Sequence, residues 1–152
     1  MQRSTHPLAT DLGLLLIRLM VGVVFVFHGA QKLFGIWGGF GIEGTAGFME
    51  GLGIPFPTLS AILAGSAEFV GGLALLTGFA QRLLAIPLAF TMFVAAFTAH
   101  SGFAAGAGGM EYPLTLAFLA AGLGLTGPGR FAVGLSSARE EGAGELAEAR
   151  GA

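Results

Sequence analysis

The stretch LSAILAGSAEFVGGLALLTGF, from Leu59 to Phe79, is apolar or small throughout except for one carboxylate, Glu68. A charge at the centre of a bilayer costs about 3 kcal/mol on insertion scales. Such a residue therefore normally faces the protein interior, finds a partner and marks a functional or structural site. The stretch predicts a membrane-spanning helix with a buried polar residue near its middle.

The composition of the whole chain supports this prediction. Of the 152 residues, 54% are hydrophobic and only 11% are charged, whereas a soluble domain carries about 25% charged residues. The chain has no cysteine, which excludes disulfides, thiolate metal sites and covalent c-type haem attachment. A net charge of -2 without a basic stripe gives no sign of nucleic-acid binding. The lipid bilayer is therefore the expected partner.

Four segments have the length and apolar character of membrane spans. A bilayer core needs roughly 20 apolar residues per helix, and the candidates run from about 12–33, 58–79, 83–100 and 112–126. We expect an all-α fold, an integral membrane four-helix bundle formed by residues 1–134. Within the first long connection, residues 42–52 suit a short helix at the membrane interface. Residues 135–152 are rich in Ala, Gly and Glu and predict a mobile polar tail.

Positive charges outside the spans predict the orientation in the membrane. In a four-span topology Lys32 falls on one side, and the other side receives Arg3, Arg82, Arg130, Arg139 and Arg150. Because Lys and Arg accumulate in cytoplasmic segments, we expect both termini in the cytoplasm.

Arg18 also lies in an apolar run and is the obvious partner of Glu68. One interpretation of this buried polar pair is a structural ion pair that locks two helices together. The other is a carboxylate that handles protons or binds a ligand, with Arg18 tuning it. The sequence alone leaves both interpretations open.

A second polar cluster is expected at the outer ends of the spans, comprising His28, Gln31, Lys32, His100, Glu111 and Tyr112. His28 and His100 lie at similar depth on different helices, so they could ligate a b-type haem or, with Glu111, a metal ion. They could equally hydrogen-bond a quinone carbonyl or assist proton transfer. The third interpretation is that these groups satisfy the backbone and lipid headgroups at helix ends. We assign no metal and no definite cofactor; quinone suits the cluster better than haem.

The same residues carry a resemblance to the DoxX family of small bacterial membrane proteins. The matching pieces are IRLMVGVVFVFHGAQKLFG from Ile17, EFVGGLALLTGFAQR from Glu68, His100, EYPLTL from Glu111 and GPGR from Gly127. The chain departs from the family at Gly134, where members often have Asp. The resemblance implies a four-helix bundle in the bacterial inner membrane. It also implies a link to oxidoreduction, because members resemble the small subunit of thiosulfate–quinone oxidoreductase or associate with antioxidant proteins.

Three functions follow, in decreasing order of support. The first is a membrane subunit of a quinone-linked oxidoreductase system, with Arg18 and Glu68 as its buried polar core. The second is a non-catalytic anchor or scaffold for a soluble redox or antioxidant partner. The third is a small proton-coupled transporter with Glu68 as its protonation site, which would need a homo-oligomer because four helices offer little room for a pathway.

Overall fold

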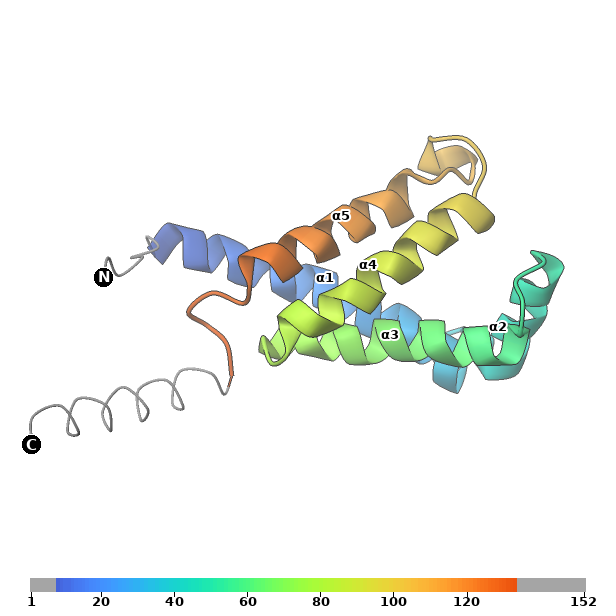
Figure 1. Cartoon of the computed structure of the whole chain (residues 1–152), viewed down its shortest axis with the longest axis horizontal. Helices are drawn as coiled ribbons and strands as arrows, with labels where there is room; N and C mark the ends of the chain where they lie inside the picture. The colour runs from blue at the N-terminus through green and yellow to red at the C-terminus, as the bar shows by residue number, and fades with distance from the viewer. Residues whose placement is uncertain (1–7, 134–152) are drawn as a thin grey trace, which may run out of the picture.

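The computed structural model describes residues 8–133, and within that range it is all-helical, with five α-helices, one 3₁₀ turn and no strand. The elements are α1 (Leu8–Phe34), α2 (Gly41–Gly51), α3 (Pro57–Thr77), α4 (Gln81–Thr98), the turn η1 (Ala105–Ala107) and α5 (Glu111–Thr126) (Figure 1). The predicted polar tail 135–152 lies outside the described residues.

The four predicted spans correspond to α1, α3, α4 and α5. The largest difference is at the start of α1, which begins at Leu8 rather than near residue 12. Asp11 is tolerated there because a carboxylate in the first turn interacts favourably with the helix dipole, and its Oδ1 accepts the backbone N–H of Arg130 at 3.2 Å. Among the described residues, three helices (α1, α3 and α4) are long and apolar enough to cross a membrane. Helix α5 has 16 residues, fewer than the usual span.

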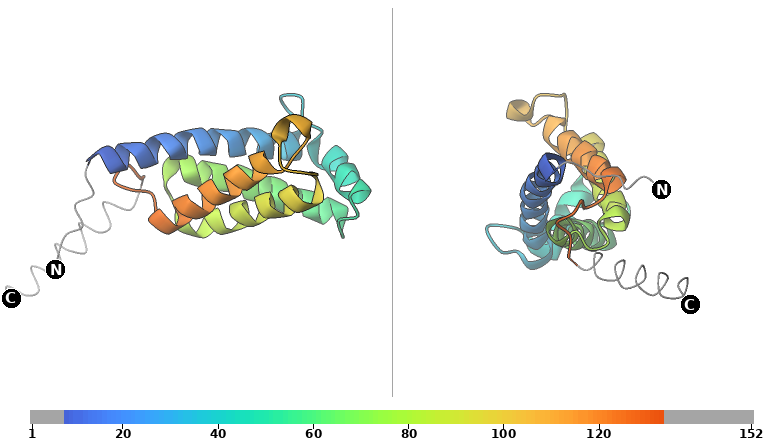
Figure 2. Two further views of the ribbon diagram at one scale, coloured as in Figure 1. Left: turned by 90° about the horizontal axis from the view of Figure 1, so that it is seen from above. Right: turned by 90° about the vertical axis from the view of Figure 1, so that its left-hand side faces the viewer.

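Helices α1 and α3 lie side by side and approach closely through glycine (Figures 1 and 2). A Cβ added at Gly72 of α3 would lie 2.7 Å from the backbone nitrogen of Val26 and 2.9 Å from the carbonyl oxygen of Gly22, both in α1. Small residues allow such close approach of membrane helices. Gly72 of α3 therefore lies on the surface that packs against α1.

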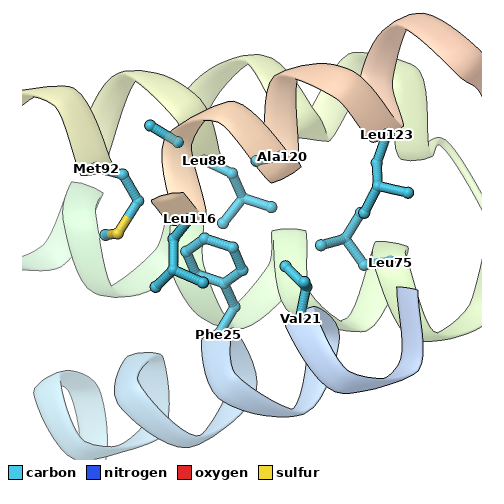
Figure 3. Close-up of a cluster of buried hydrophobic side chains, with 9 residues drawn as sticks. Val21, Phe25, Leu75, Leu88, Met92, Leu116, Ala120 and Leu123 are labelled. Carbon is cyan, nitrogen blue, oxygen red and sulfur yellow. The ribbon is translucent and has the colours of Figure 1, made fainter. Parts of the chain in front are cut away.

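The apolar core is formed by side chains from α1, α3, α4 and α5 that point toward one another (Figure 3). The buried members are Val21, Phe25, Leu75, Leu88, Met92, Leu116, Ala117, Ala120 and Leu123. Many other large apolar side chains on the same helices face outward, among them Leu16, Leu63, Ile86 and Phe118. A core inside and an apolar surface outside are what a lipid solvent requires, since outward Leu and Phe side chains then contact hydrocarbon rather than water.

Candidate functional site

A cavity of about 710 Å³ lies between the helices, with walls contributed by the five α-helices, by the connection between α2 and α3, and by Ala99 and His100 after α4. Most of its lining is apolar, including Phe25, Phe48, Met49, Phe90 and Leu116. Figure 1 shows α2 and the α4–α5 connection at the same end of the molecule, opposite the ends of the described segment. A largely apolar cavity of this size with a few convergent polar groups is typical of small-molecule sites.

Glu68 contributes the most deeply buried charge of this cavity and is paired with Lys32. The Lys32 Nζ lies 2.6 Å from Glu68 Oε2, with the carboxylate side chain 1% exposed and the lysine side chain 30% exposed. Helix α3 places Glu68 beside the last turn of α1, where Lys32 sits. The second carboxylate oxygen, Oε1, is buried and has no hydrogen-bond partner among residues 8–133. A buried acceptor without a partner is costly, so this oxygen marks a place where a further donor is needed.

Three more of the predicted residues line the same cavity: His28 from α1, His100 just after α4, and Tyr112 from α5. The His100 Nδ1 lies 2.9 Å from the carbonyl oxygen of Ala95. A carbonyl can only accept, so Nδ1 carries the proton and Nε2 of the neutral ring is an acceptor. The ring of His28 packs edge-on against Phe27, with the ring centroids 5.5 Å apart. The expected convergence of these residues with Lys32 is found.

Gln31 and Glu111 do not join the cavity, because both satisfy backbone groups. The Gln31 side chain donates to the carbonyl of Trp37 at 3.0 Å, and Glu111 Oε1 accepts the backbone N–H of Ala105 at 2.6 Å. Glu111 is thus engaged in the α4–α5 connection rather than available beside the two histidines. Within residues 8–133 no group of three or more His, Cys, Asp or Glu side chains is placed to hold a metal ion.

Arg18 is buried, as predicted, but its guanidinium bonds to backbone carbonyls instead of Glu68. Its Nε donates to Leu75 at 2.8 Å, its Nη2 to Phe131 at 2.9 Å and to Leu76 at 3.3 Å, and its Nη1 to Pro128. The carbonyls in the last turn of a helix lack intrahelical donors, and a cation suits the negative end of the helix dipole. Arg18 therefore connects the end of α3 to the segment after α5, and the expected ion pair with Glu68 is corrected to Lys32–Glu68.

Sequence reasoning did not include α2 in the site, although Thr45, Phe48 and Met49 of α2 line the cavity. The apolar residues of segment 42–52 indicated a helix at the interface, and the structure confirms a helix over Gly41–Gly51. The same apolar pattern could have indicated that one face of this short helix packs against the bundle. Its position over α3 depends on the connections at both ends, which periodicity does not reveal.

Comparison with known proteins identifies relatives of this chain. The profile of the DoxX family matches residues 13–101. The chain is 33% identical over 127 residues to the inner membrane protein YqjF of Escherichia coli, an alignment that covers 81% of this chain and 90% of YqjF. It is 31% identical over 88 residues to a Bacillus subtilis protein named "Putative oxidoreductase CatD", covering 58% of this chain and 60% of that protein. The inner membrane protein YphA of Escherichia coli is 32% identical over 87 residues, covering 57% of this chain and 58% of YphA. No solved structure matches significantly.

The span-length helices and these relatives define a multi-pass protein of the inner membrane. More specifically, the chain belongs to the DoxX family.

Proposed function

We propose that this protein is the membrane subunit of a quinone-linked oxidoreductase system and that its cavity holds the headgroup of a membrane quinone. The observation that carries this proposal is the cavity itself, in which apolar walls surround a small group of polar side chains contributed by all five α-helices and by His100 after α4. Quinones are lipid-soluble and combine an apolar ring with two polar oxygens, so they need this combination of surfaces. The printed name of one relative, "Putative oxidoreductase CatD", also supports a role in oxidoreduction.

The residues present fit such a headgroup. Glu68 Oε1 is an unpartnered buried acceptor beside the Lys32 ammonium, so the site offers both a donor and an acceptor at short range. Quinones carry two electrons and two protons when reduced. Lys32, Tyr112 and His28 can donate hydrogen bonds to the oxygens of the ring, and Glu68 and His100 can accept them. Apolar side chains of α2 and α4 line the same space.

The proposal includes a four-helix membrane bundle with both termini in the cytoplasm. Support comes from the arginine distribution and from α5, which packs against α4 and completes the common core despite its short length. The cavity then lies near the outer surface, while Arg18 and the segment after α5 lie near the inner surface. A soluble oxidoreductase partner, which supplies or receives the electrons, belongs to the proposal because the chain has no motif for a bound redox centre.

Native mass spectrometry of the protein, extracted gently from its own membrane, tests the proposal. We expect a bound mass equal to that of the host quinone in the wild-type protein and its loss in Ala67→Phe, because Ala67 lines the cavity and the larger ring fills it. Val70→Phe is the matched control: Val70 lies on the same helix, is exposed and does not line the cavity. A quinone-free wild-type chain that carries a co-extracted soluble protein would contradict the proposal and favour the anchor function.

A further inference from the structure

Both donors and acceptors of hydrogen bonds line the cavity. Five residues with a hydroxyl group line the cavity, and three of them give their proton to a backbone carbonyl: Ser60 to Pro55 at 2.8 Å, Thr91 to Pro87 at 2.8 Å and Thr98 to Val94 at 2.7 Å. These three hydroxyl oxygens therefore present only acceptor lone pairs to the cavity.

The two strongest acceptors come from different elements. Glu68 Oε1 on α3 is buried and unpartnered among residues 8–133. His100 uses Nδ1–H for the carbonyl of Ala95, and its Nε2 has no hydrogen-bond partner in the part of the chain that the structure describes. Lys32 is the nearest donor to Glu68, but it already spends one N–H on Oε2 of that carboxylate. Tyr112 is 48% exposed, so its hydroxyl can be satisfied by the membrane interface.

We infer that the cavity selects the reduced form of its ligand, a hydroquinone whose two O–H groups donate to Glu68 Oε1 and His100 Nε2. This inference rests on the proposed function and names the redox state that the site prefers. A quinone has only acceptor oxygens, so it leaves the buried Glu68 oxygen unpaired, and an unpaired buried polar group lowers affinity more than a missing contact does. A hydroquinone satisfies the same oxygen.

Binding to the full-length protein in lipid nanodiscs tests the inference without any electron transfer. The probes are a decyl-substituted 1,4-benzohydroquinone, the corresponding benzoquinone and the hydroquinone dimethyl ether, measured by isothermal titration calorimetry under anaerobic conditions with empty nanodiscs subtracted. All three carry the same tail, and only the first donates hydrogen bonds. We expect the hydroquinone to bind about tenfold or more tightly than the other two, the effect of one hydrogen bond to a charged group.

Glu68→Gln gives a sharper version of the test. Lys32 donates to the oxygen nearest to it, so it fixes the oxygen of the new amide on its own side and turns the NH₂ group toward the position of Glu68 Oε1. The variant replaces the acceptor by a donor, and the preference for hydroquinone should disappear or reverse. Glu43→Gln is the matched control, because Glu43 is exposed on α2 and does not line the cavity. His100→Phe should reduce the preference independently, should Glu68→Gln fail to fold.

The outcomes separate this inference from the proposed function. If the wild-type protein binds the quinone as tightly as the hydroquinone or more tightly, and binds the dimethyl ether more weakly, the selectivity is overturned and a quinone site is left in place. Equal binding of all three probes means that the tail alone is recognised, which also overturns the selectivity. Absence of saturable binding by every probe overturns the cavity as a quinone site as well.

Discussion

At the scale of single residues, the structure stabilises two buried charges in different ways. Glu68 is opposed by one ammonium group, that of Lys32. Within the described part of the chain, Arg18 pairs with no carboxylate and donates to four backbone carbonyls. Removing one member of a buried charge pair is more destabilising than replacing both, because it leaves an uncompensated charge. The two members of the Lys32–Glu68 pair should therefore respond differently to substitution.

We expect Lys32→Met to lower the free energy of unfolding by about 3 kcal/mol, since it leaves the Glu68 carboxylate buried and unpaired. Glu68→Gln should cost only about 1 kcal/mol, because the half-buried Lys32 ammonium can extend to the membrane interface. The double variant should resemble Glu68→Gln. Denaturant titration in detergent micelles measures all three; equal effects of the two single changes would show that the unpaired Glu68 carboxylate carries no extra cost.

Arg18→Met should be destabilising by about 3 kcal/mol or more, since several buried carbonyls lose their donor at once. The segment of residues 127–133 should be released from the end of α3, which hydrogen exchange of its amides would detect as a loss of protection. The control is Arg130→Met, because the Arg130 side chain is exposed and its backbone N–H keeps the bond to Asp11. If both variants exchange alike in 127–133, Arg18 does not hold this segment.

At the scale of helices, the positions of the spans could be predicted because hydropathy and length depend on the residues of one segment alone. The partner of Glu68 could not be predicted from the sequence. Lys32 and Arg18 lie on the same face of α1. The sequence does not reveal that a backbone carbonyl after α5 accepts a hydrogen bond from Arg18. The backbone carbonyls of an irregular segment need hydrogen-bond donors, and which donors they meet depends on where the fold places that segment. The convergence of His28, His100 and Tyr112 was predictable, because the three residues lie at similar depth in their spans. The hydrogen bond from the backbone N–H of Ala105 to Glu111 was not predictable.

The close contact between α1 and α3 leads to a prediction for glycine. Gly72→Ala should cost about 1–3 kcal/mol, because the added methyl group meets the backbone of α1, which cannot move without separating the two helices. Gly13→Ala is the control: this glycine lies inside α1 with nothing near a new Cβ, and alanine favours the helix by up to about 1 kcal/mol. Thermal unfolding of both variants checks the difference. A Gly72→Ala protein as stable as wild type would mean that the α1–α3 interface is looser than the coordinates indicate.

At the scale of the whole molecule, the short helix α5 decides the topology. Three spans would place the two ends of the chain on opposite sides of the membrane, whereas four place them together. Helix α5 lies alongside α4 and supplies Leu116, Ala120 and Leu123 to the core (Figure 3). Its middle therefore packs into the same apolar core as the other three helices. A local thinning of the bilayer by a few ångströms can accommodate a helix shorter than the usual span.

Cysteine labelling distinguishes the two topologies cleanly, because the chain contains no cysteine of its own. We expect Ser4→Cys and Ser136→Cys to react with a membrane-impermeant maleimide only after permeabilisation of the cells. Glu43→Cys, exposed on α2, should react in intact cells. The positive-inside distribution of arginine is the physical reason for this orientation. Labelling of Ser136→Cys in intact cells, with Ser4→Cys protected, would show that α5 does not cross the membrane. The cavity would then be closed on one side by a helix lying at the interface, not by a span.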